Sequence, residues 1–104
     1  MTTMSDLPMS SLLEKANYIK KAMGNIEKEI TNQTFVVQSN GIEVHIKGTC
    51  TLEKIIVDST TGKQPTQQLL PKIVDAVNKS INEINNRRQQ EFKIISQNIQ
   101  DSES

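Results

Sequence analysis

The stretch Asn40-Gly-Ile-Glu-Val-His-Ile-Lys-Gly48 decides the fold of this chain. Aliphatic residues at every second position from Ile42 to Ile46 alternate with charged or polar neighbours, as in a strand with one buried and one solvated face. The preceding pair, Asn40 and Gly41, tolerates the positive φ angles of a type I′ turn. The stretch therefore predicts the turn and the second strand of a β-hairpin.

The residues on both sides of this stretch extend the hairpin into a sheet. The β-branched and aromatic residues of 34–37 favour a first strand before the turn. A third strand is expected over about 51–57. Because Leu52 and Ile55 are an odd number of positions apart, they share one face of that strand only if a β-bulge lies in it.

A helix is predicted before the sheet, because Ser11 and Glu14 have the spacing of a capping box. Gly24 lies on the outward side of this helix, where it lowers the stability of the helix by about 1 kcal/mol relative to alanine. The apolar residues of the helix recur at steps of three and four, which places them along one seam: Leu12, Ala16, Ile19, Met23, Ile26 and Ile30.

A second helix is predicted to open near Pro71, since proline is harmless in a first turn. Helical spacing then continues through Ile73, Val74, Val77, Ile81, Ile84, Phe92, Ile95 and Ile99. A helix over 71–99 would measure roughly 43 Å, whereas six-residue strands span about 20 Å, so the helix overhangs its sheet. Its last apolar residues are covered either by the first helix bending round or by a second copy, and we favour the second copy.

Length and composition bound the organisation of the chain. A chain of 104 residues fits one α+β domain, which we place at 11–99 between flexible ends at 1–10 and 100–104. Only 35% of the residues are hydrophobic and 3% are aromatic, so little apolar surface is available for a core. We therefore expect a protein partner.

Charge and motif content exclude several classes of function. Twelve basic residues balance twelve acidic ones, so any cationic surface must be local. No apolar run is long enough for a membrane helix, and the first nine residues lack the features of a signal peptide, so we expect a cytoplasmic protein without membrane contact.

Catalysis and metal binding are not expected either. Cys50 alone forms neither an intramolecular disulfide nor a zinc site, and we expect it half buried in a strand. His45 has no evident partners for metal or base chemistry and is expected to be solvated on its strand. Without a nucleophile and base pair, no enzyme activity, cofactor, metal or small-molecule substrate is expected.

The order of helix, three strands and long helix, with particular residues in the strands, resembles the YbaB/EbfC family over about residues 12–96. A first sequence motif of the family, in the second strand, is matched by Gly41, Val44, Ile46 and Gly48. A second motif, in the third strand, is matched by Ile55, Val57 and Asp58, and a helical motif is matched by Ala76, Val77 and Asn78. The resemblance implies a nucleoid-associated protein that binds duplex DNA as a homodimer with little sequence specificity. Such a protein carries helical arms, lies in the nucleoid, and affects nucleoid organisation and gene expression.

Site residues follow from this resemblance together with the helical spacing. The cations expected to contact DNA are Lys20, Lys21, Lys28, Lys79, Arg87, Arg88 and Lys93, and the residues expected at the dimer interface are Val44, Ile46, Ile84, Phe92 and Ile95. Lys21 and Lys28 lie opposite the seam of the first helix, although a merely solvated helix face also explains them. Arg88 projects onto the seam of the second helix, where an ion pair with Glu91 at the dimer interface competes with DNA contact.

A coiled-coil interaction protein, such as a prefoldin-like holdase or an assembly adaptor, is the alternative from a different class. Two heptad helices joined by a hairpin describe that architecture too, and charge neutrality favours it. The third strand favours the DNA-binding family.

Overall fold

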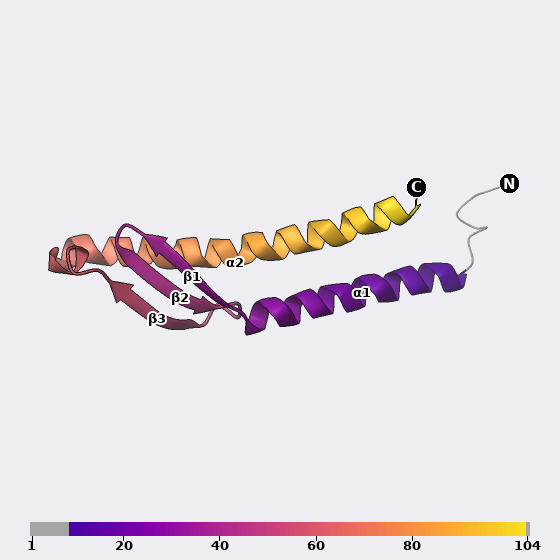
Figure 1. Cartoon of the computed structure of the whole chain (residues 1–104), viewed down its shortest axis with the longest axis horizontal. Helices are drawn as coiled ribbons and strands as arrows, with labels where there is room; N and C mark the ends of the chain where they lie inside the picture. Colours follow the sequence, from indigo (N-terminus) through magenta and orange to yellow (C-terminus); the bar gives the residue numbers. More distant parts are fainter. Residues whose placement is uncertain (1–8, 104) are drawn as a thin grey trace.

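The computed structural model describes the backbone of residues 9–103 and the side chains of residues 11–98. It contains a long helix, three strands, a short 3-10 helix and a second, longer helix (Figure 1): α1 (Met9–Asn32), β1 (Thr34–Ser39), β2 (Ile42–Lys47), β3 (Leu52–Val57), η2 (Thr61–Lys63) and α2 (Thr66–Glu103). This is the α-β-β-β-α order predicted from the sequence.

The sheet is antiparallel throughout and has the strand order β1-β2-β3. Asn40 and Gly41 have φ angles of 52° and 81°, which confirms the tight turn between β1 and β2. The predicted bulge in β3 is also confirmed, because His45 pairs with Lys54 while Ile46 pairs with Leu52. Glu53 is the extra residue.

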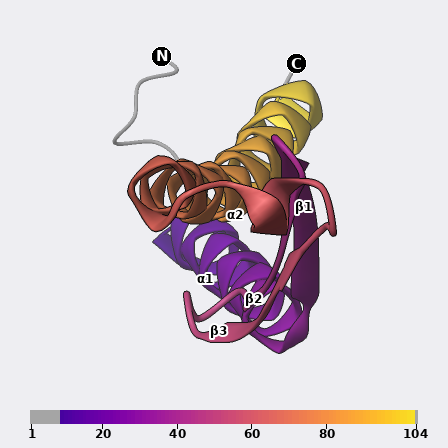
Figure 2. The ribbon, with the colours of Figure 1, turned by 90° about the vertical axis from the view of Figure 1, so that its left-hand side faces the viewer.

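The core lies between the sheet and α2, which packs across β1 and β2. Alternate residues of β2 point into it, as the period-two pattern predicted. The core is made of Ile30, Phe35, Ile42, Val44, Ile46, Ala76 and Ile84. Figure 2 shows that β3 lies on the far side of β2 from α2, so the inner face of β3 is left without a helix over it.

Two glycines let chain segments approach closely around this core. A Cβ on Gly48 would collide with the carbonyl of Ile30 at the end of α1, while the Gly48 amide donates to the carbonyl of Gln33 at 3.0 Å. A Cβ on Gly41 would collide with the side chain of Thr61. These contacts fix α1 and η2 against opposite ends of β2.

Beyond the sheet, α1 and the second half of α2 form an antiparallel helical arm (Figure 1). The molecule measures 73 × 21 × 17 Å, and its radius of gyration is 20.8 Å. A compact domain of this length would have a radius of gyration of about 13 Å. The arm therefore dominates the shape of the single chain.

The same chain covers the apolar residues of the arm more fully than the sequence suggested. Ile95 is buried and Phe92 is half buried within one copy. The favoured expectation that a second copy covers these residues is therefore wrong for Ile95, because α1 of the same chain runs beside this part of α2. The side chain of Ile99 lies outside the described residues.

The predicted helix limits are shifted at both ends. Helix α1 begins at Met9, so Ser11 lies inside the first turn and is not its cap. Helix α2 begins at Thr66, because the Pro65 carbonyl already accepts hydrogen bonds from the amides of Gln68 and Leu69. It continues to Glu103, past the predicted limit at Ile99; residues 1–8 and 104 of the expected flexible ends lie outside the described backbone.

The seam of α1 is buried only where the helix meets the sheet. Ile30 is buried and Ile19 and Ile26 are half buried, whereas Leu12, Ala16 and Met23 are exposed. The repeat of apolar residues therefore marks the side of α1 that faces α2 without burying all of it.

Candidate nucleic-acid interface

The cations predicted to contact DNA divide into paired and unpaired groups. On α2, the ammonium group of Lys79 lies 3.2 Å from a carboxylate oxygen of Asp75 and 3.0 Å from the hydroxyl oxygen of Ser39. About two turns later, Arg87 donates to the carboxylate of Glu91 at 3.0 Å. Both cations are thus already neutralised by a carboxylate on their own helix.

Arg88 joins the two helices. Its guanidinium donates twice to the carboxylate of Glu27 on α1, with both distances 2.9 Å, and this bidentate contact raises the pKa of Arg88. The prediction that Arg88 pairs with Glu91 is wrong, because Glu91 pairs with Arg87. Arg88 therefore holds α2 to α1 at the base of the arm.

Three of the lysines on α1 have no such partner. Among the described residues, the side chains of Lys20, Lys21 and Lys28 make no ion pair or hydrogen bond, and all three residues are exposed. They line a shallow hollow of about 640 Å³ on the outer face of α1, which we call the α1 hollow, together with Glu14, Asn17, Tyr18, Gly24 and Asn25. Three cations against one carboxylate make this hollow locally basic in a chain of zero formal charge.

The spacing inside the α1 hollow suits one strand of a nucleic acid. Lys21 and Lys28 are seven residues apart on the face opposite the buried Ile30, about 10 Å along the helix. Successive phosphates of one DNA strand advance about 3.4 Å along the duplex axis. For a duplex with its axis parallel to α1, the spacing of the two residues corresponds to about three phosphate steps.

Lys93, the remaining predicted cation, is exposed and unpaired among the described residues, but it is on the other side of the arm. It lies opposite the buried residue Ile95 around α2, just as Lys21 lies opposite the seam of α1. Since the apolar sides of α1 and α2 face each other, Lys21 and Lys93 point in opposite directions. One straight duplex that contacts the α1 hollow does not reach Lys93 of the same chain.

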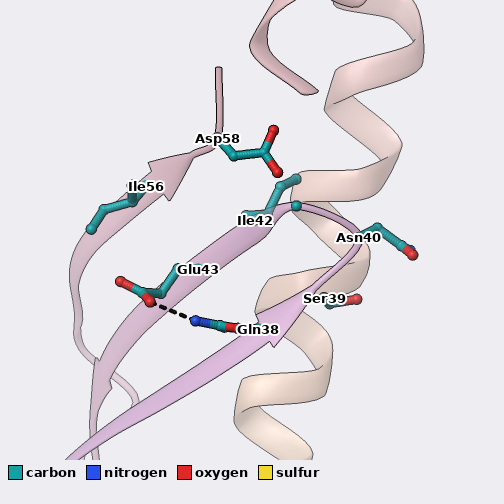
Figure 3. A pocket seen from close by; sticks show the side chains of 8 residues that line it. Gln38, Ser39, Asn40, Ile42, Glu43, Ile56 and Asp58 are labelled. Atoms are coloured by element: carbon teal, nitrogen blue, oxygen red, sulfur yellow. Dashed lines mark hydrogen bonds between the residues drawn. The ribbon is translucent and has the colours of Figure 1, made fainter. Parts of the chain in front are cut away.

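A second hollow, of about 370 Å³, lies at the hairpin between β1 and β2 (Figure 3). Glu43 and Asp58 line it. Hydrogen bonds from His45 and Gln38 lower the pKa of Glu43, and hydrogen bonds from Thr61 lower the pKa of Asp58, so both carboxylates are ionised at neutral pH. Two anions at its wall make this hollow unsuited to phosphate.

A third hollow runs between β1 and α2, and half of its lining residues are uncharged and polar. Its two charged residues are Glu83 and Arg87, and Arg87 is paired with Glu91. Of these three hollows, the α1 hollow has the excess of unpaired cations.

The predicted dimer-interface residues lie in the interior of the single chain. Val44, Ile46 and Ile84 have no exposed surface, and Ile95 is only 7% exposed. Phe92 alone keeps part of its surface. The period-two and helical patterns marked these residues as apolar, but they could not distinguish a face covered by the same chain from one covered by a partner.

Two further expectations change in the structure. Cys50 is exposed in the turn between β2 and β3 with a φ angle of 66°, so the half-buried strand position is wrong. His45 is partly buried, with its Nε2 atom 2.8 Å from a carboxylate oxygen of Glu43. In the part of the chain described, no cluster of three or more His, Cys, Asp or Glu residues could hold a metal ion, and no helix is apolar and long enough to cross a membrane.

Several residues of the family motifs have structural roles. Asp58 accepts a hydrogen bond from the Thr61 amide at 2.6 Å, and its own amide donates to the carbonyl of Gly41 at 3.0 Å. Ala76 is fully buried against the sheet. These residues hold the sheet to η2 and α2, and they lie away from the α1 hollow.

Comparison with known proteins identifies the class. A family model, the YbaB/EbfC DNA-binding family, matches residues 4–99. The chain belongs to this family of DNA-binding, nucleoid-associated proteins.

A crystal structure of the uncharacterized protein HP0035 from Helicobacter pylori superposes with a TM-score of 0.64. The two sequences are 16% identical, and the match covers 86% of this chain and 98% of that chain. This likeness shows the fold. No curated protein matches the sequence significantly.

Proposed function

We propose that the chain binds duplex DNA through the α1 hollow, as a homodimer, with little sequence preference and without catalysis. The observation that carries the proposal is the contrast between the three unpaired lysines of α1 and the cations Lys79, Arg87 and Arg88, which carboxylates already neutralise. Unpaired lysines release counterions from phosphates at no cost in broken ion pairs. Together with the family membership, this contrast also supports a location on the nucleoid and effects on its organisation and on gene expression.

Low sequence preference follows from the kind of side chain in the α1 hollow. Lysine ammonium groups are compact charges that bind phosphate oxygens, whereas sequence is read mainly by hydrogen bonds to base edges in the grooves. The bidentate guanidinium of Arg88, which would suit a guanine edge, is bound to Glu27. The expected role is therefore to coat, bend or bridge DNA.

The homodimer is supported by apolar surface that the single chain leaves open. Leu52 and Ile55 are on the inner face of β3, where no helix covers them, and they are 46% and 38% exposed. Leu70 and Val74, on the first turns of α2, are 54% and 59% exposed. On the helical wheel of α2, Leu70 and Val74 lie beside the core residues, on the same side as Arg88, which faces α1. The side of α2 that faces β1 is on the other flank of the core.

We call these four residues the open apolar face. An exposed apolar surface of this kind is typical of an interface. A second copy is the occupant we infer, because in a two-fold dimer the same face of each chain covers that of the other.

Light scattering of matched variants tests the dimer. Val74→Glu places a charge in the open apolar face, whereas Ile94→Glu places one at a residue 50% exposed on the same helix but outside that face. We expect the wild type and Ile94→Glu to be dimers and Val74→Glu to be a monomer with unchanged helix content. A wild-type monomer, or a Val74→Glu dimer, would contradict this interface.

Fluorescence anisotropy with a labelled duplex tests DNA binding. We expect binding that weakens steeply as salt is raised, and similar affinities for unrelated duplex sequences. Absence of binding at low salt would overturn the proposal and favour the alternative of a coiled-coil interaction module.

A further inference from the structure

Gly24 occupies the middle of the α1 hollow, and the fold does not explain it. A Cβ built on Gly24 meets no atom within 4 Å, in contrast to Gly41 and Gly48, where neighbouring segments would collide with one. A glycine inside a helix lowers helix stability, because its backbone loses the most freedom on folding. The chain therefore carries a destabilising residue at a position where the fold admits a side chain.

The neighbours of Gly24 indicate what its missing side chain provides. Lys21 lies three residues before it and Lys28 four residues after it, so the three residues follow one stripe along the outer face of α1. Between the two ammonium groups the helix backbone is bare. A ligand can therefore approach the backbone of α1 closely at a point between two of the cations of the α1 hollow.

We propose that Gly24 is a DNA-contact residue, at which one phosphodiester strand lies directly against the backbone of α1 between Lys21 and Lys28. This inference rests on the proposed function and adds to it a contact that depends on shape as well as on charge. With a side chain at position 24, the strand is held farther from the helix, and both lysines must extend farther to reach its phosphates.

Another protein helix is a poorer occupant of this position. Helices that pack at a glycine usually bring apolar or small residues with it, but the α1 hollow presents three unpaired lysines around Gly24. Two copies of this face would repel each other. A polyanion with a regular backbone matches both the charge and the bare helix.

Graded substitutions test the inference, with thermal unfolding and duplex affinity measured on the same full-length variants. Gly24→Ala and Gly24→Leu are both expected to unfold at higher temperature than the wild type, since alanine and leucine favour helix. DNA affinity is expected to fall as the side chain at position 24 grows, from glycine through alanine to leucine, with the leucine variant about eightfold weaker at 0.1 M salt, the equivalent of one lost phosphate contact.

Ser96→Leu is the matched control, because Ser96 is exposed on α2 outside the α1 hollow. It gains helix propensity too, but its DNA affinity is expected to stay at the wild-type value. Wild-type affinity in Gly24→Leu, or an equal loss in Ser96→Leu, would overturn the role of Gly24 while leaving DNA binding in place. Failure of the wild type to bind duplex would overturn the proposed function and this inference with it.

Discussion

Removing the two stripe lysines of the α1 hollow should change how DNA affinity depends on salt. In Lys21→Ala/Lys28→Ala, two exposed and unpaired ammonium groups are lost, and no ion pair or hydrogen bond of the fold is broken among the described residues. The fold should therefore be unaffected. Any loss of affinity then reports contact with DNA.

The magnitude follows from counterion release. Each phosphate contact contributes about 0.9 to the slope of log K against log salt, so two lost contacts reduce the slope by about 1.8 per chain. For each chain that contacts the duplex, that slope makes the double variant bind about 60-fold more weakly at 0.1 M salt and about ninefold more weakly at 0.3 M. The defect should thus shrink as salt rises.

Fluorescence anisotropy over that range of salt measures both quantities. The charge-matched control is Lys79→Ala/Arg87→Ala, which also removes two positive charges, but ones already bound to Asp75 and Glu91. Its slope should remain close to that of the wild type. If the two double variants lost equal affinity with equal change in slope, net charge would explain the effect and the α1 hollow would not be the site.

Three further predictions concern the scaffold. Arg88→Ala should lower the free energy of unfolding by about 1 kcal/mol, as measured by urea denaturation, because its partner Glu27 is 47% exposed and screened; wild-type stability would contradict the pairing. Asp58 has a lowered pKa, so its ion contributes stability above the unfolded pKa of about 3.9 that is lost as pH falls through the folded value. Asp58→Ala should therefore unfold at lower temperature than the wild type at pH 7, with the difference disappearing well below pH 4, and a difference independent of pH would refute the role of the charge. Ile84→Ala should lower the free energy of unfolding by about 3 kcal/mol, because Ile84 is fully buried. Ile94→Ala, at a 50% exposed position of the same helix, should lower it by less than about 1 kcal/mol, and equal losses in the two variants would contradict the assigned core.

The sheet could be predicted because its signals are local. The Asn40-Gly41 turn needs only two neighbouring residues, and the buried face of β2 follows from alternation over 42–46. The bulge at Glu53 followed from the parity of Leu52 and Ile55, although parity alone could not place it.

The candidate site could be predicted only in part. Lys21 and Lys28 stood out by helical spacing, but whether a cation is free depends on partners far away in the sequence. Arg88 and Glu27 are 61 residues apart, so no local pattern in the sequence indicates their ion pair. For the same reason the sequence could not show that Ile95 is buried within one chain.

The most direct test of the account is to map the DNA contacts by backbone amide chemical shifts, titrating the labelled protein with a short duplex. We predict that the largest changes fall on residues 17–28 of α1, and that amides around Lys79 and Lys93 of α2 change little. Large changes on α2 or on the open side of the sheet, with residues 17–28 unaffected, would contradict it.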